Sequence, residues 1–116
     1  MGSLPKRKTP WGAWKVLFRG KGFQVKHIVV SPGHRFSLQF HKLRTERWVI
    51  VSGRGKLTLG KRTKPVKKGD YVVISAFQNH RLHNTSRTPL VFIEVMQGQY
   101  IGEDDIIRLQ DDYNRV

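Results

Sequence analysis

Short runs of β-branched, aromatic and alternating apolar residues recur along almost the whole chain, and they constrain its fold more than any other feature. The runs include WKVLF, FQVKHIVV, RFSLQF, RWVIVS, YVVIS and LVFIEVM, separated by turn sequences such as SPGH, SGRG and NTSRTP. Strands of this length at this spacing are typical of an all-β sandwich or barrel. Helical character is confined to GEDDIIRLQDDY, whose acidic residues near the start predict a short C-terminal helix.

Length and composition limit the organisation of the chain and the chemistry open to it. With 116 residues, we expect one domain over residues 10–116, preceded by a basic flexible tail over residues 1–9. There is no cysteine, so any metal must be held by nitrogen and oxygen ligands. The N-terminal stretch lacks the apolar segment of a secretory signal, and no run approaches the ~18 apolar residues of a membrane span. We therefore predict a cytoplasmic protein with no membrane partner.

The charge is strongly basic, with 22 Lys and Arg against 8 Asp and Glu, a net charge of +14. Five of the carboxylates lie in the last fourteen residues, so the rest of the chain is more basic still. Such a surface favours anionic partners without choosing among them. Nucleic acid is the least favoured, because the sequence contains no helix-turn-helix, zinc-finger or RNA-binding signature that would organise its cations.

Polar side chains converge on one face of the candidate strand over residues 34–41. In an extended strand Gln39 and His41 point to one side, together with Arg35 and Ser37, while Phe36, Leu38 and Phe40 point to the other. An ordinary amphipathic surface strand would also explain this alternation. If the polar side instead faces a barrel interior, the three apolar residues need a cover, since a small barrel does not leave such a patch in water. The cover would be the N-terminal strand or a second subunit, and we predict a homodimer.

Two groups of polar residues framed by glycines favour the interior position. Gly33 and Gly53 frame the first group, which contains Gln39, His41 and Glu46; Gly69 opens the second, which contains Ser75, Phe77, His80 and Asn84. The intervals resemble the two motifs of the cupin superfamily. This resemblance implies a double-stranded β-helix, or jelly roll, with one divalent metal ion (zinc, manganese, cobalt, nickel or iron) inside the barrel. It implies Gln39, in place of the usual histidine, with His41, Glu46 and His80 as the metal ligands.

A narrower resemblance extends from about Thr9 to Arg115. The segments TPWGAWKVL, FQVKHIVVSPGHRFSLQFHKLRTERWVIVSGRGKLTLG and GQYIGEDDIIRLQDDYNR are similar to the cupin domain of type II mannose-6-phosphate isomerases. The resemblance implies a small anionic sugar-phosphate substrate and a metal-dependent interconversion of mannose 6-phosphate and fructose 6-phosphate. In such a reaction the metal polarises the sugar oxygens while a base moves a proton. Four cations lie near the motifs as candidates for binding the phosphate: Arg44, Arg35, Arg81 and Lys26.

The sequence departs from that family pattern at titratable positions near the motifs. Leu43 and Arg47 stand where the family commonly has histidines, and His83 replaces an acidic residue. His34 or His83 would then have to act as acid or base, with Arg44 as a further catalytic candidate. The alternative hypothesis is a non-catalytic metal-containing cupin that binds a phosphosugar or a nucleotide sugar.

Overall fold

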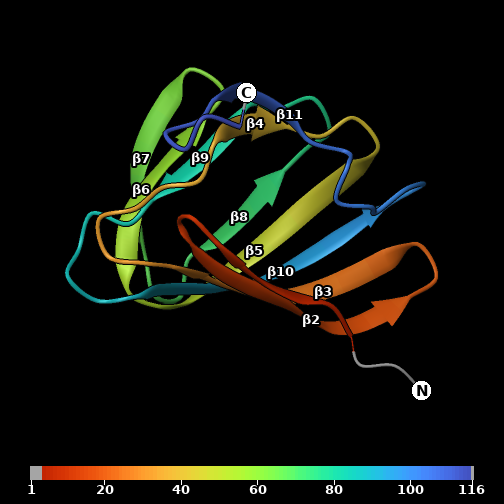
Figure 1. Cartoon of the computed structure of the whole chain (residues 1–116), viewed down its shortest axis with the longest axis horizontal. Coiled ribbons are helices and arrows are strands. Elements are labelled where there is room, and N and C mark those ends of the chain that lie inside the picture. The colour runs from red at the N-terminus through yellow and green to blue at the C-terminus, as the bar shows by residue number, and fades with distance from the viewer. Residues whose placement is uncertain (1–3, 116) are drawn as a thin grey trace.

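Two antiparallel sheets packed face to face make up the computed structural model of the chain, which describes residues 4–115 (Figure 1). The first sheet has the order β1 (Lys6–Thr9), β2 (Gly12–Gly20), β3 (Phe23–Val30), β10 (Leu90–Gly98), β5 (Arg44–Ser52), β8 (Tyr71–Ile74). The second has the order β11 (Ile107–Gln110), β4 (Leu38–Phe40), β9 (His80–His83), β6 (Arg54–Leu59), β7 (Arg62–Lys67). This arrangement confirms the predicted all-β jelly roll. Within residues 4–115 there is no helix long and apolar enough to cross a membrane.

The two chain ends differ from the predictions. The expected C-terminal helix is wrong: residues 107–110 form β11, in which Arg108 lies opposite Gln39 of β4. Apolar and polar residues alternate in IRLQ with the period of a strand, and β4 offers a free edge for pairing. Of the expected flexible tail, Lys6–Thr9 form β1, paired with β2. A charged strand suits this place because charges on an edge discourage pairing with other chains. Residues 1–3 lie outside the described part.

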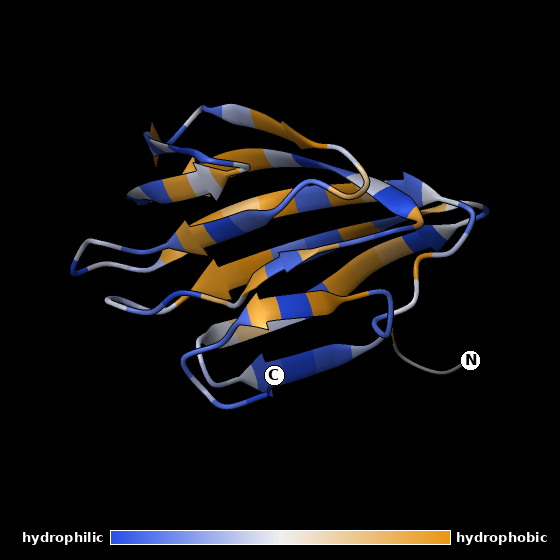
Figure 2. Ribbon diagram, turned by 90° about the horizontal axis from the view of Figure 1, so that it is seen from above, coloured by the Kyte–Doolittle hydropathy of each residue, from blue (hydrophilic) through white to orange (hydrophobic). Residues whose placement is uncertain are grey.

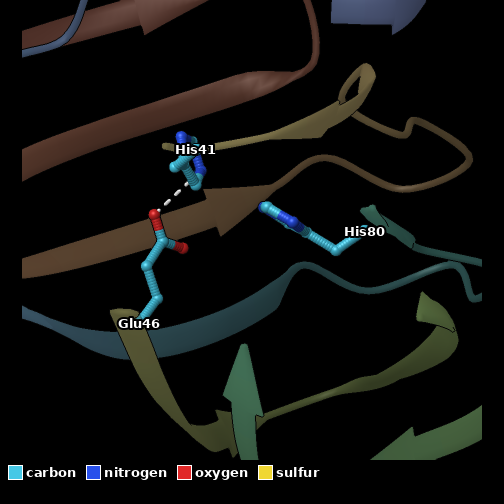
Figure 3. Close-up of side chains that lie close together, drawn as sticks. All are labelled: His41, Glu46 and His80. Carbon is cyan, nitrogen blue, oxygen red and sulfur yellow. Dashed lines mark ion pairs between the residues drawn. The ribbon is translucent and has the colours of Figure 1, made fainter. Parts of the chain in front are cut away.

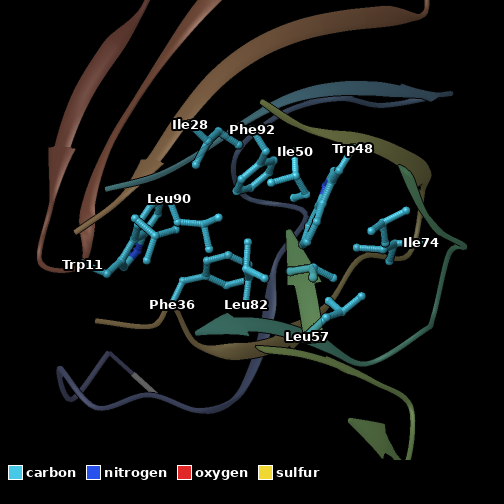
Figure 4. Packing of buried hydrophobic residues seen from close by; sticks show 13 residues of the cluster. Trp11, Ile28, Phe36, Trp48, Ile50, Leu57, Ile74, Leu82, Leu90 and Phe92 are labelled. Atoms are coloured by element: carbon cyan, nitrogen blue, oxygen red, sulfur yellow. The ribbon is translucent and has the colours of Figure 1, made fainter. Parts of the chain in front are cut away.

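The buried faces of the strands change character from one end of the barrel to the other. Along β10 the inward residues run from Leu90 and Phe92 to Glu94, and the alternation of polar and apolar residues can be followed along the strands in Figure 2. At the apolar end thirteen buried residues form one core cluster, in which the rings of Phe92 and Trp48 pack at 4.5 Å between centroids (Figure 4). At the other end the buried residues are charged, and Glu94 lies between Lys26 of β3 and Trp48 of β5. Because burying a charge is costly unless it is paired, this end is a candidate site.

The strand predicted over residues 34–41 is shorter than expected. Only Leu38–Phe40 form β4, and the irregular backbone before it turns Phe36 inward. The Phe36 ring packs edge-on against Trp11 at 5.5 Å and against Trp48 at 6.1 Å between ring centroids. Phe36 therefore belongs to the core, and the predicted outward face of three apolar residues does not form. Phe40 stacks on Phe77 instead, at 6.3 Å.

Candidate metal centre and ligand cavity

Three of the four predicted metal ligands come together at the polar end of the barrel. His41 follows β4, Glu46 lies on β5 and His80 opens β9, where it pairs directly with Gln39. One ligand atom from each of His41, Glu46 and His80 lies within 4.8 Å of the other two, and all three residues are buried. Figure 3 shows the two imidazoles and the carboxylate converging from separate strands. Residues far apart in the sequence thus share one small volume.

Hydrogen bonds to backbone carbonyls orient both imidazoles so that Nε2 points toward the cluster. The Nδ1–H of His41 donates to the carbonyl of Asp105 at 2.6 Å, and the Nδ1–H of His80 donates to the carbonyl of Gln78 at 3.0 Å. Each Nε2 atom therefore faces the cluster, as in histidines that bind metals, and Nε2 of His41 lies 3.0 Å from Oε2 of Glu46. The Nε2 atom of His80 is buried and has no hydrogen-bond partner in the described part of the chain. Such an orphaned acceptor is suited to binding a cation.

The charges around the cluster are set by burial and by close partners. Burial is the largest cause that lowers the pKa of His80 to about 4, and the positive charge of Arg44 lowers it further, so its imidazole is neutral near pH 7. For Glu46 burial opposes ionisation, but hydrogen bonds from His41 and Glu94 and the positive charge of Arg44 outweigh burial and hold the pKa of Glu46 well below its ordinary value. Two imidazoles and one carboxylate fit a divalent transition metal.

Arg44 lies at this cluster and not at a separate phosphate site. Its Nε and Nη2 atoms are both 2.9 Å from Oε2 of Glu46. Nη2 also lies 3.4 Å from Nε2 of His41. The guanidinium therefore faces two of the three ligand atoms, and a divalent ion that binds here has Arg44 as its immediate neighbour.

Glu94 is a site residue that the motifs did not identify. The indole N–H of Trp48 donates to Oε1 of Glu46 at 3.1 Å and to Oε1 of Glu94 at 3.2 Å. Burial and the negative charge of Glu46 raise the pKa of Glu94 well above its ordinary value, so this side chain keeps its proton to a higher pH than an ordinary glutamate. The sequence does carry a signal for it, since Glu94 stands in register with the inward Phe92 and Met96 in LVFIEVM.

Two residues of the cluster, Glu46 and His80, line a cavity of about 150 Å³. Aromatic rings form part of its wall, and the Nζ of Lys26 lies 4.0 Å above the ring of Trp14. Strands of both sheets line the cavity, and among them are β1 and β11, edge strands of the two sheets that do not pair with each other. The aromatic and cationic residues that line it are Trp11, Trp14, Phe36, Trp48, Phe92, Arg7, Lys26, Arg44, Arg108 and Arg115.

The structure separates the predicted ligand and phosphate residues into two groups. Gln39, Lys26 and Arg44 line the cavity, with Gln39 accepting a hydrogen bond from Ser37 Oγ at 2.6 Å. Lys26 is paired with the carboxylate of Glu103. The other two predicted phosphate ligands, Arg35 and Arg81, do not line it.

Both of these arginines are engaged elsewhere. Arg35 is partly exposed and makes two hydrogen bonds to Asp112, at 2.7 and 2.9 Å. The guanidinium of Arg81 donates to the backbone carbonyls of Phe36 and Gln110, at 2.9 and 3.1 Å. Arg81 therefore helps to hold the C-terminal segment against the barrel.

The structure also places the two predicted acid–base histidines outside the cavity. His34 is exposed, with its Nδ1 2.7 Å from the hydroxyl of Tyr113. His83 lies at the end of β9, where its backbone bridges to Arg35. The substituted positions Leu43 and Arg47 are exposed or face outward, and Arg47 donates to Gln97 at 2.6 Å. Neither predicted histidine is thus within reach of a ligand in the cavity.

Relatives of known description match nearly the whole chain. The alginate biosynthesis protein AlgA of Pseudomonas aeruginosa is 45% identical over 107 residues, which cover 92% of this chain and 22% of AlgA. The mannose-1-phosphate guanylyltransferase RfbM of Salmonella typhimurium is 42% identical over 101 residues, which cover 87% of this chain and 21% of RfbM. The chain thus spans about a fifth of the length of the relatives it matches.

Solved structures agree on the fold. A variant oxalate decarboxylase of B. subtilis superposes with a TM-score of 0.80 at 16% identity, over 91% of this chain and 30% of that one. A Klebsiella pneumoniae protein described as having a double-stranded β-helix domain superposes with a TM-score of 0.70 at 21% identity, over 76% of this chain and 77% of that one. The chain has the cupin double-stranded β-helix fold.

The relatives correct the predicted activity. They are described as guanylyltransferases and polysaccharide biosynthesis proteins, not as isomerases, so the prediction that this chain is a mannose-6-phosphate isomerase is wrong. The two histidines predicted as acid or base, His34 and His83, also lie outside the residues that line the cavity. The family model described as Mannose-6-phosphate isomerase C-terminal matches residues 5–111, and on that match the chain belongs to this family of cupin domains.

Proposed function

We propose that this chain is a non-catalytic cupin module that binds a phosphosugar or a nucleotide sugar in its barrel cavity. One observation carries the proposal: a single cavity is lined by Glu46 and His80 of the buried cluster, by aromatic rings and by five cationic side chains. Aromatic faces pack against the apolar faces of sugar rings, and arginines bind phosphate oxygens. The description of RfbM and of other relatives names mannose 1-phosphate, which makes mannose-configured ligands the first to test.

The proposal includes one divalent ion held by His41, Glu46 and His80, with the amide oxygen of Gln39 as a fourth donor. The nitrogen and oxygen donors suit zinc, manganese, cobalt, nickel or iron. When bound, such an ion would polarise an oxygen of the ligand. Glu94, when protonated, would donate a hydrogen bond to a sugar hydroxyl, and Trp48 would hold both carboxyl groups in place.

Calorimetric titration tests the binding proposal. The protein is stripped of metal, reloaded with each candidate ion in turn, and titrated with mannose 1-phosphate, mannose 6-phosphate, GDP-mannose and unmodified mannose. We expect at least one phosphorylated ligand to bind more tightly than mannose, and we expect no fructose 6-phosphate from mannose 6-phosphate in a coupled assay. Absence of binding by every phosphorylated ligand, with metal content verified, would contradict the proposal; turnover would contradict its non-catalytic part.

A further inference from the structure

Three buried polar side-chain atoms lack a hydrogen-bond partner among the described residues, and all three belong to residues that line the same cavity. They are Thr9 Oγ1, His80 Nε2 and Arg108 Nε. His80 belongs to the candidate metal cluster formed with His41 and Glu46. Thr9 ends β1 and Arg108 lies in β11, the two edge strands that flank the cavity. A buried polar atom without a partner is costly, so three in one cavity point to groups supplied by a ligand.

The unpartnered atoms of Thr9 and Arg108 complement an acceptor oxygen. The Nε–H of an arginine can only donate a hydrogen bond, and the hydroxyl of a threonine can turn its proton toward an acceptor. Both groups therefore need an oxygen that carries lone pairs. Phosphate oxygens are such acceptors, and arginine offers them several N–H groups in a fixed plane.

The charges at the rim single out the same place. Of the other cations in the cavity wall, Arg44 is paired with Glu46, Lys26 with Glu103 and Arg115 with Asp111. For Arg108 and Arg7 no ion pair is found within residues 4–115. Two uncompensated arginines match the charge of a phosphate monoester, which is about −1.5 to −2 at neutral pH.

We propose that Arg108, Thr9 and Arg7 form a phosphate subsite at the edge of the cavity between β1 and β11. This subsite would hold the phosphoryl group while the sugar ring extends toward Glu46 and His80. The inference rests on the proposed function for the identity of the whole ligand, but the subsite itself requires only a phosphate. It also replaces Arg35 and Arg81, the phosphate ligands predicted from the sequence, which lie outside the cavity.

Two substitutions and one matched control test the subsite in the full chain. Arg108→Met removes the charge and keeps much of the side-chain length, and Thr9→Val removes only the hydroxyl. Arg62→Met removes a charge from exposed β7, away from the cavity. We expect Arg108→Met to weaken mannose 1-phosphate binding at least roughly tenfold and Thr9→Val to weaken it several-fold. Arg62→Met should leave the affinity unchanged.

A readout with inorganic phosphate separates this inference from the proposed function. In ¹⁵N-labelled protein, titration with inorganic phosphate should shift the Nε–H resonance of Arg108 saturably, and Thr9→Val should weaken that response. If mannose 1-phosphate binds equally well to wild type and to Arg108→Met, the subsite is wrong while the proposed function stands. If phosphate shifts the Arg108 resonance but no phosphosugar binds, the subsite stands and the proposed function fails. An unmoved resonance at saturating phosphate overturns the subsite.

Discussion

His80→Leu separates the metal-binding role of His80 from its structural role. In the metal-free protein the substitution removes one hydrogen bond to the carbonyl of Gln78, worth about 1 kcal/mol, and also removes a buried nitrogen without a partner, which costs about 1–3 kcal/mol. Leucine suits the surroundings, because the imidazole packs against Phe36 and Trp48, at 6.4 and 5.9 Å between centroids. The metal-free variant should therefore be as stable as wild type, or more stable by about 1–2 kcal/mol.

With metal present the order should reverse. An ion at one hundred times its dissociation constant stabilises the wild type by about 2.7 kcal/mol, which raises Tm by roughly 10 °C in a domain of this size. Loss of one imidazole ligand should weaken metal binding by roughly a hundredfold or more. At the same metal concentration the variant would then gain about 0.4 kcal/mol, or roughly 2 °C.

Scanning calorimetry with chelator and with each metal measures both effects. His27→Leu is the matched control, because His27 points to the outer face of β3, away from the cluster, and this variant should keep the full metal-induced shift. A full metal-induced shift in His80→Leu would refute the assignment of the ion to this cluster. If metal-free His80→Leu is more than about 2 kcal/mol less stable than wild type, the argument that the unpartnered Nε2 atom of His80 destabilises the metal-free protein is refuted.

Three further predictions concern stability and assembly. Hydrogen bonds from Arg115 lower the pKa of Asp111 to about 2 in the folded protein. As the pH falls, Asp111 is therefore protonated in the unfolded chain before it is protonated in the folded one. Its contribution to the free energy of unfolding is present above about pH 4 and is lost as the pH falls toward 2. Asp111→Asn should cost about 1 kcal/mol at pH 7, allowing for solvent screening, and flatten this acid dependence in urea unfolding. Phe77 is exposed and has a positive φ of 67°. Phe77→Gly should change the free energy of unfolding by less than about 1 kcal/mol, because glycine adopts this φ without strain. A loss of stability above about 2 kcal/mol would contradict that reason. The predicted homodimer has a candidate surface in the exposed apolar residues of β5 and β8. Light scattering should therefore give twice the 13.5 kDa mass of the chain, and the double substitution Val49→Lys and Val73→Lys should give a monomer. A monomeric wild type would contradict the prediction.

The resemblance of the two motifs to those of cupins predicted the cluster of His41, Glu46 and His80, which the structure brings together. Gln39, His41 and Glu46 lie close along the chain, and a period of two determines which side of a strand each side chain faces. The position of Phe36 could not be predicted in this way, because the backbone before β4 is irregular and ends the alternation. Composition likewise favoured a helix near the C-terminus, whereas pairing with the free edge of β4 made β11 a strand.

The residues of the proposed phosphate subsite were harder to predict, because their positions depend on pairing between segments that are distant in the sequence. Thr9 lies in a segment expected to be a flexible tail, and Arg108 in a segment expected to be helical, so nothing in the sequence placed them together. Arg35 and Arg81 were preferred because they lie near the motifs, but nearness along the chain does not decide which cations remain unpaired. In the folded structure Arg35 is paired with Asp112 and Arg81 donates to backbone carbonyls, so neither remains unpaired.

The balance of charge around the cavity predicts that metal and phosphate bind cooperatively. Three cations of the cavity wall are paired with carboxylates and the pKa of Glu94 is raised, so Arg7 and Arg108 leave the wall with an excess of positive charge. A divalent cation adds to this excess, and an anionic ligand reduces it, so each should strengthen the binding of the other by the same factor. We expect mannose 1-phosphate to bind roughly five- to fiftyfold more tightly to the metal-loaded protein, a coupling typical of linked sites, with the gain reduced by added salt. Unmodified mannose, which lacks the phosphate charge, is the control for a general effect of the metal on the cavity. An equal gain for both ligands would show that the metal acts through contacts with the sugar and not through the charge of the cavity.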